Sequence, residues 1–187
     1  MNEAIYVKSF PIEGQKDLLV ENGIYDSFFA TWVSIEDINA VAMRLEVAPE
    51  AKTICSFQAA MRSCEPSPGM QWFWITRHAP GWSHILTLSG ASPCPDTLSL
   101  NRQRVFELAY IGGIEEIYPL AYTYDGKSDA DFFDVLEYAP YWEDFDSPRR
   151  IPVEEELEQQ LIIMGRITGR FYDREWFSSQ GLLCKIP

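Results

Sequence analysis

Two runs of aromatic and β-branched residues, separated by a turn sequence, constrain the fold of this chain more than any other feature. Residues 70–77 read MQWFWITR, and residues 82–88 read WSHILTL. Rings and β-branched side chains fit the pleated surface of a strand, and the intervening HAPG supplies a proline and a glycine for a turn. The two runs therefore predict an antiparallel β-hairpin, which needs further elements to bury its apolar surface.

Two more strand-like runs follow the hairpin. Residues 104–111 read RVFELAYI, residues 117–124 read IYPLAYTY, and Gly112 and Gly113 lie between them. Pro119 lacks the backbone N–H that a central strand needs, so it indicates an edge position or a β-bulge. An exposed edge near Pro119 leaves open that the protein is a structural or regulatory subunit that forms a homo-oligomer.

Helical spacing appears on both sides of this strand-rich block. In residues 34–47, Ser34 is a candidate N-cap and apolar residues recur three and four positions apart. The second helix is expected over residues 153–168, because Pro152 and three glutamates mark its start and Gly169 marks its end. A short helix is expected after Asp173.

The order of these elements predicts an α+β fold. The helices do not alternate regularly with the strands, which argues against a parallel sheet built from βαβ units. We expect an antiparallel sheet of about four to six strands with two main helices packed on one side. The 187 residues suit a single domain, residues 1–187, and hydrophobic residues at 47% supply the material for its core.

Acidic residues strongly outnumber basic ones. The chain has 28 Asp and Glu against 15 Lys and Arg, a net charge of −13. Such a charge repels phosphate backbones and anionic lipid, so we expect no direct nucleic-acid partner and no membrane partner. The four cysteines form no CxxC pair, and the N-terminal residues lack the basic and apolar regions of a signal peptide. These features predict a cytoplasmic protein with reduced thiols.

The residue patterns of well-known catalytic and cofactor sites are absent from the sequence. The two histidines, His78 and His84, do not have the spacing of a zinc-protease helix, and no serine lies in a G-x-S-x-G turn. Neither common glycine-rich phosphate motif occurs. We therefore predict no catalytic residues, no metal site and no cofactor. One alternative stays open, an enzyme or small-ligand binder whose pocket near the hairpin is lined by Trp72, Trp74, Trp82 and His84.

The negative charge is concentrated late in the chain. Residues 129–158 contain eleven acids and two bases, a net charge of −9, with six aromatic residues among them. One interpretation is a solvated loop whose rings pack back onto the core. The other is an interface, in which rings supply contact energy and carboxylates attract a basic protein partner. The residues expected to bind this partner are Tyr141, Trp142, Glu143, Asp144, Phe145 and Asp146.

A succession of short motifs over residues 30–185 resembles a family of uncharacterised small bacterial domains that look like immunity proteins. The motifs are Gly81-Trp82, Leu98-Ser99, Arg104-Val105-Phe106, Asp125-Gly126, Phe133-Asp134 and Ile167-Thr168-Gly169 followed by Trp176. The resemblance implies a helix ahead of a strand meander and a protein that binds a partner rather than an enzyme. With the acidic segment, it favours a non-enzymatic binding protein, immunity- or inhibitor-like, that engages a basic protein.

Overall fold

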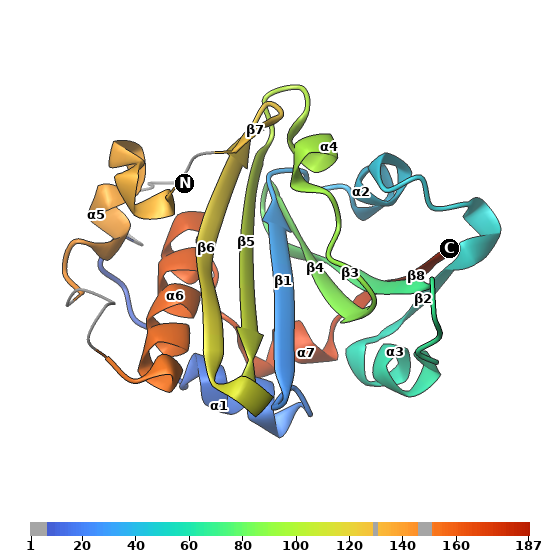
Figure 1. The fold of residues 1–187 in the computed structure, drawn as a ribbon, viewed down its shortest axis with the longest axis horizontal. Helices are drawn as coiled ribbons and strands as arrows, with labels where there is room; N and C mark the ends of the chain where they lie inside the picture. Colours follow the sequence, from blue (N-terminus) through green and yellow to red (C-terminus); the bar gives the residue numbers. More distant parts are fainter. Residues whose placement is uncertain (1–6, 129–130, 146–150) are drawn as a thin grey trace.

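Among the residues that the structure describes, eight strands form one sheet that is antiparallel throughout, in the order β2-β8-β3-β4-β1-β5-β6-β7 (Figure 1). The computed structural model describes residues 7–128, 131–145 and 151–187. The predicted α+β class with an antiparallel sheet is confirmed, although the sheet has more strands than expected. The strands are β1 Ser27–Val33, β2 Lys52–Ser56, β3 Gln71–Ala79, β4 Trp82–Ser89, β5 Arg104–Ile111, β6 Glu116–Tyr124, β7 Lys127–Ser128 and β8 Gln180–Ile186.

The predicted hairpin is confirmed as β3 and β4. Ala79 pairs with Trp82 across a two-residue turn, in which Gly81 has a φ of 81° that an L side chain rarely adopts. The runs at 104–111 and 117–124 are β5 and β6. The register of this pair shifts between Glu107 and Ala109, opposite the part of β6 that contains Pro119, as the predicted bulge requires.

Helices cover both faces of the sheet, and this corrects the expectation of two helices on one side. The helices are α1 Gln15–Glu21, α2 Ile38–Arg44, α3 Phe57–Ser63, α4 Pro95–Ser99, α5 Ala139–Trp142, α6 Val153–Thr168 and α7 Arg174–Ser178. Residues of α1, α3, α6 and α7 pack with Trp32, Trp74 and Phe106 in the larger core cluster. Residues of α2 and α4 pack with Phe73 and Ile85 in a second cluster. Alternate residues of β3 thus belong to opposite cores.

The first predicted helix is shorter than its apolar spacing indicates. It begins at Ile38, and its N-cap is Asp37, which accepts a hydrogen bond from the backbone N–H of Asn39. Ser34 has a different role, because its hydroxyl accepts from the N–H of Arg104 at 2.7 Å and donates to Gln103 at 3.0 Å. The side chain that was expected to cap the helix instead ties β1 to β5.

The other predicted helix ends are confirmed. The helix α6 begins after Pro152 and ends at Gly169, which has a left-handed φ of 79°. Asp173 caps α7 by accepting from the backbone N–H of Trp176 at 2.6 Å. None of the helices in the described ranges is long and apolar enough to cross a membrane.

Candidate functional site

The predicted pocket residues of the hairpin lie in the core. Trp74 and His84 are fully buried, and Trp82 is 5% exposed. The ring of Trp176 contacts both Trp74 and His84, with centroid separations of 5.5 and 5.0 Å. Trp72 is half-buried, with the Lys185 ammonium 5.1 Å from its ring centroid. Trp74 and Trp82 belong to the larger core cluster, Trp72 packs against it, and His84 contacts the rings of Trp32 and Trp176. These side chains thus contribute to the core where a pocket was expected.

Both histidines are structural parts of this core. Nε2 of His84 lies 2.6 Å from the Tyr172 hydroxyl, and Nε2 of His78 lies 3.0 Å from the Arg170 carbonyl oxygen. Burial lowers the pKa of His78 to about 3 and that of His84 well below its usual value, because a charged imidazole is poorly solvated there. Neutral, enclosed imidazoles serve packing and hydrogen bonding rather than acid–base chemistry with a substrate.

The acidic segment is folded onto α6 through Arg166. The Arg166 side chain is fully buried and forms two hydrogen bonds with the Asp144 carboxylate, at 2.7 and 3.0 Å. Its guanidinium carbon lies 4.7 Å from the ring centroid of Phe10 and 4.6 Å from that of Phe145, so the cation is held between two rings. The hydrogen bonds from Arg166 lower the pKa of Asp144. The charge of Asp144 is therefore balanced by Arg166 of the same chain, although the Asp144 side chain is 26% exposed.

The neighbouring residues of this segment are also engaged internally. The backbone carbonyl of Tyr141 accepts from Arg166 at 2.8 Å, and Trp142 packs edge-on against Phe133 at 5.3 Å. Glu143 is exposed and faces Lys8 at 3.8 Å. Asp146 lies outside the described residues. Tyr141, Trp142 and Phe145 thus each pack against the larger core cluster, as the first interpretation of this segment expects.

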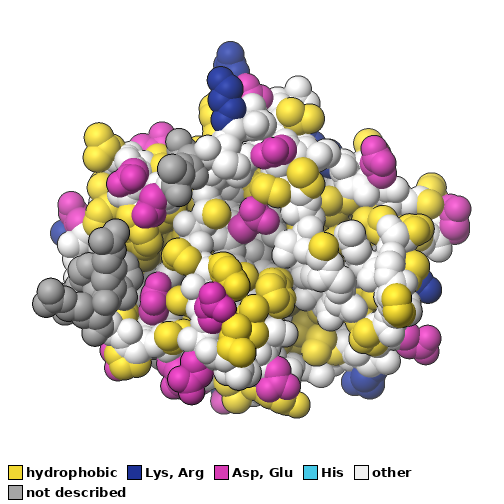
Figure 2. Space-filling view, viewed as in Figure 1, with side chains coloured by type: hydrophobic (Ala, Val, Ile, Leu, Met, Phe, Trp, Pro, Cys, Tyr) yellow, Lys and Arg dark blue, Asp and Glu magenta, His cyan; other side chains and the backbone are white. Residues whose placement is uncertain are grey.

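A different surface combines exposed rings with carboxylates. The helices α2 and α4 cover only part of the second face of the sheet, and the rest of this face is open to solvent. We call the uncovered part of β1, β4, β5 and β6 the open sheet face. Figure 2 shows hydrophobic side chains gathered over it, with acidic side chains among them. Its residues are Ser27, Phe29, Thr87, Ser89, Glu107, Ala109, Ile111, Glu116, Tyr118 and Ala121.

The strand register places these residues in rows. Phe29 pairs with Ala109, which in turn pairs with Tyr118, and Tyr118 is 49% exposed. Thr31 pairs with Glu107 in the next row. The residues that the four strands turn toward this face include Glu107 and Glu116 but no lysine or arginine. The open sheet face is consequently both apolar and negatively charged.

Glu107 is the unusual group on this face. Its carboxyl is half-buried beside α4, and no group in the described part of the chain donates a hydrogen bond to it. Burial, with a smaller contribution from the charge of Asp96, raises the pKa of Glu107 to about 7. A cation placed beside this carboxyl would restore its charged form, because opposite charge lowers the pKa of an acid.

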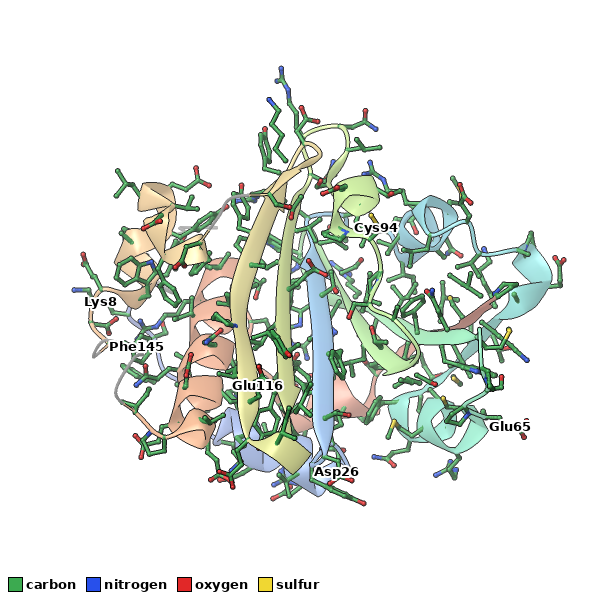
Figure 3. All side chains as sticks on the ribbon, in the orientation of Figure 1. Lys8, Asp26, Glu65, Cys94, Glu116 and Phe145 are labelled. Carbon is green, nitrogen blue, oxygen red and sulfur yellow. The ribbon has the colours of Figure 1, made fainter. Side chains whose placement is uncertain are left out.

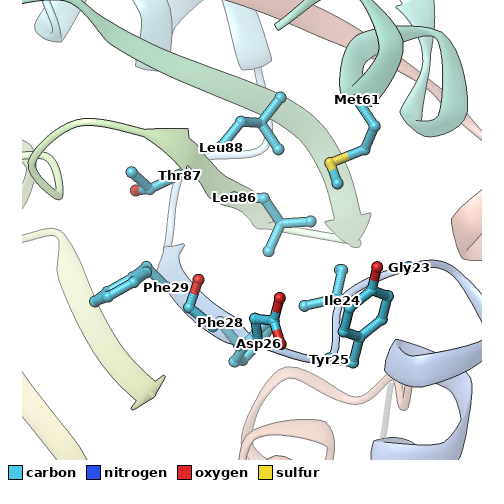
Figure 4. Close-up of a pocket in the computed structure, with 11 residues that line it drawn as sticks. Gly23, Ile24, Tyr25, Asp26, Phe28, Phe29, Met61, Leu86, Thr87 and Leu88 are labelled. Carbon is cyan, nitrogen blue, oxygen red and sulfur yellow. The ribbon is translucent and has the colours of Figure 1, made fainter. Parts of the chain in front are cut away.

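A socket of about 170 Å³ lies between the start of β1, the end of β4 and α3, and its lining combines Phe29 and Thr87 of the open sheet face with Leu86 and Leu88 of the opposite face. Leu88 and Met61 form one side of the socket, and Tyr25, Asp26 and Phe29 form the other (Figure 4). Figure 3 shows Asp26 and Glu116 at the same end of the sheet. Small-molecule sites usually enclose about 300–1,000 Å³, so this socket suits a single protruding side chain.

The alternation of side chains along β5 is a sequence signal for the open sheet face, and an interpretation based on runs of charge does not detect it. In β5 the side chains of Glu107, Ala109 and Ile111 are less buried than Phe106, Leu108 and Tyr110, which alternate with them. This alternation is typical of a strand with one uncovered face. The acidic segment drew attention because its charges are contiguous in the sequence, whereas the acids of the open sheet face are far apart.

The four cysteines form no disulfide. Within the described ranges, no cluster of three or more His, Cys, Asp or Glu side chains is arranged to hold a metal ion. Comparisons with protein-family models, with curated protein sequences and with solved structures find no match for this chain.

Proposed function

We propose that the protein is a non-enzymatic binding protein, immunity- or inhibitor-like, that engages a basic protein partner through the open sheet face. The observation that carries this proposal is the side-chain content of that face, where exposed rings adjoin Asp26, Glu107 and Glu116 without a basic residue from the strands. Aromatic anchors supply contact energy in protein interfaces, and complementary charge raises association rate and specificity.

The socket supports a specific mode of contact. Leu86, Leu88 and Met61 give part of its wall an apolar surface, and the exposed Asp26 carboxylate belongs to its lining. A lysine or arginine side chain can lay its aliphatic stem along an apolar wall while its charged end reaches a carboxylate. A basic side chain from the partner therefore fits the socket in both shape and charge, and the rows around Phe29 and Tyr118 extend the contact.

The same proposal places the protein in the cytoplasm, which the four unpaired cysteines support. The resemblance to immunity-like domains adds the expectation that the partner is a toxin-like protein. A homo-oligomer formed through the edge of β6 is less well supported than a basic partner on the open sheet face. The bulge near Pro119 interrupts the edge that a second copy would extend. The enclosed hairpin tryptophans offer little support for the small-ligand alternative.

The test is a matched pair of charge-reversal variants. One carries Asp26→Lys and Glu116→Lys on the open sheet face, and the other carries Glu50→Lys and Glu155→Lys at exposed positions elsewhere. Each double reversal replaces two carboxylates by two ammonium groups, so the net charge of both variants changes by +4, from −13 to −9. Proteins captured by the wild-type chain are identified, and the purified partner is then titrated by calorimetry against all three forms.

We expect the partner to be basic, and its affinity to fall by about tenfold or more for the first variant, which corresponds to a loss of about 1.4 kcal/mol. The second variant should bind the partner with an affinity within about threefold of wild type, because its substitutions change the net charge of the protein but not the open sheet face. Equal losses in the two variants would show that net charge alone drives binding. An unchanged affinity in the first variant would exclude this face.

A further inference from the structure

A second hollow, of about 640 Å³, lies beside the start of β5 and the end of β6, and its lining is positively charged. Its lining includes Arg102, Arg104, Lys127, Tyr122, Tyr124 and Glu137. Figure 2 shows Lys and Arg side chains gathered at this end of the molecule, where β7 lies at the top of Figure 1. Three cations and one carboxylate give the lining a local charge of +2 in a chain whose net charge is −13.

The sheet register and two linked turns fix the positions of these cations. Arg104 pairs with Tyr124, and Tyr124 pairs with Lys127. The backbone N–H of Arg102 donates to the Asp125 carboxylate at 3.0 Å, so the loop before β5 is tied to the turn between β6 and β7. The same turn is held by a hydrogen bond from the N–H of Gly126 to the Ser99 hydroxyl at 2.9 Å.

Arg102 is held in an unfavourable backbone conformation. Its φ is 60°, in the left-handed region that costs an L residue other than glycine, asparagine or aspartate about 1–2 kcal/mol. Asn101, immediately before it, also has a positive φ of 61°. Strain of this kind persists where the surrounding structure imposes it, and it is common at ligand-binding sites. With this backbone conformation, Arg102 lines the hollow together with Lys127.

The three cations form no ion pair within 4 Å in the part of the chain that the structure describes, although Glu137 lies in the lining. Arg166, Arg170 and Arg174 each form an ion pair with a carboxylate, whereas Arg102, Arg104 and Lys127 form none within 4 Å. The Arg104 guanidinium instead lies 5.0 Å from the ring centroid of Trp82. Like charges gathered in one hollow repel one another, so an anion bound among them would be stabilised.

We infer that this hollow binds a small phosphorylated ligand with a planar ring, of the size of a mononucleotide. Its volume falls within the range of about 300–1,000 Å³ that small-ligand sites occupy. Guanidinium groups match phosphate oxygens in two-pronged hydrogen bonds, and an ammonium adds a point charge. Tyr124, which is 40% exposed, offers a ring face on which a planar group can stack.

A small molecule fits this site better than a nucleic-acid strand. The segment that contains Val135 and Glu137 lines one side of the hollow, and Glu137 adds a negative charge there. The chain's overall charge of −13 repels a polyanion more strongly than a single phosphate. The site is separate from the open sheet face, because Arg104 and Tyr122 point to the opposite side of the sheet from Glu107.

The experiment titrates the full chain with AMP, adenosine, inorganic phosphate and a ten-residue single-stranded oligothymidylate, using calorimetry and backbone amide NMR shifts. The test variant carries Arg102→Gln and Lys127→Gln, both at exposed positions. The control carries Arg62→Gln and Lys52→Gln on α3 and β2, which removes the same two types of charge.

We expect AMP to bind more tightly than adenosine or phosphate, with shifts at residues 102–104 and 122–127. Its affinity should fall about tenfold or more in the test variant and stay within about twofold in the control. Equal binding of AMP and adenosine, or no binding of AMP at millimolar concentration, would overturn the inference. So would equal losses in the two variants, or tighter binding of the oligonucleotide than of AMP. None of these outcomes depends on the protein partner of the open sheet face.

Discussion

The Tyr172 hydroxyl oxygen lies 2.6 Å from Nε2 of His84, at a point where the tyrosine is 4% exposed and the histidine is fully buried. His78 is close by, with its ring centroid 5.7 Å from that of His84. Two neutral imidazoles thus share one desolvated region of the core. Each makes the free energy of unfolding decrease as the pH falls below the usual pKa of histidine.

The two histidines make the fold sensitive to acid. The folded pKa of His78 is about 3, so the stability that this histidine confers is present above pH 6.5 and is lost as the pH falls toward about 3; the lowered pKa of His84 acts in the same direction. His78 alone removes up to about 2 kcal/mol of the free energy of unfolding between pH 6.5 and 5, at about 1.4 kcal/mol per pH unit, and His84 adds to this loss. Unfolding at pH 5, followed by calorimetry in buffers of different ionisation enthalpy, should show uptake of about two protons from these groups.

A single substitution separates the contribution of one histidine. In His78→Gln the amide can still donate to the Arg170 carbonyl, but it takes up no proton. The variant should lower the proton uptake at pH 5 by about one. Uptake equal to that of the wild type would show that His78 is already charged in the folded protein.

Glu107→Gln tests the half-buried carboxyl of the open sheet face. The folded pKa of about 7 lies above the usual 4.5, so the stability that the neutral form confers is present below pH 4.5 and is lost as the pH rises through 7. The variant keeps the neutral form, and it should be more stable than wild type at pH 8 by about 1–2 kcal/mol, a value reduced for solvent screening. Urea unfolding at pH 5 and pH 8 measures the difference, with Glu116→Gln as the exposed control on the same face.

Asp144→Asn tests the ion pair that holds the acidic segment on α6. Removing one partner leaves the buried Arg166 cation uncompensated, which in fully buried pairs costs about 3–5 kcal/mol. Because the Asp144 side chain is 26% exposed, we expect a loss of about 1–3 kcal/mol in the free energy of unfolding. Glu143→Gln, beside it but exposed, should change stability by less than about 0.5 kcal/mol. Equal effects of the two changes would contradict the arrangement at Arg166.

Gly181→Ala tests the close approach of β8 to β3. A Cβ at this position would lie 2.6 Å from the Ile75 carbonyl oxygen and 2.7 Å from the Trp74 ring, and the backbone atom cannot move aside. Overpacking of this kind costs about 1–3 kcal/mol, and we expect the melting temperature to fall accordingly. Gly113→Ala is the control, because a Cβ there meets no atom within 4 Å. A melting temperature unchanged by Gly181→Ala would show that the two strands can separate slightly.

Local signals in the sequence predicted many of the elements. Pro80 and Gly81 between two apolar runs are enough to predict a hairpin, and Gly169 is enough to end α6. The strands β2 and β8 were not predicted, because they pair with each other from distant parts of the chain and no local turn joins them. The face of the sheet on which α2 packs could not be predicted from the sequence either. Because β3 is buried on both faces, its side-chain pattern does not indicate which face a helix covers.

The candidate site illustrates the same limit. The acids at residues 141–146 were visible as a run, but the partner of Asp144 is Arg166, 22 residues later, and no pattern in the sequence joins the two. The cations at Arg102 and Lys127 likewise meet only through the register of β5, β6 and β7. A site built from residues that are far apart in the sequence has no continuous sequence motif. The absence of a glycine-rich phosphate loop is therefore weak evidence against phosphate binding.

The interior position of β8, between β2 and β3, bears on how the protein forms during translation. Residues 52–56 cannot join the sheet until residues 180–186 have left the ribosome, because within the described ranges β2 pairs with β8 alone. Until then β3 presents an unpaired edge rich in tryptophan and phenylalanine to the cell. Assembly of this half of the sheet is therefore expected after synthesis of the strand that completes it, and the nascent chain is a natural client for chaperones during that interval.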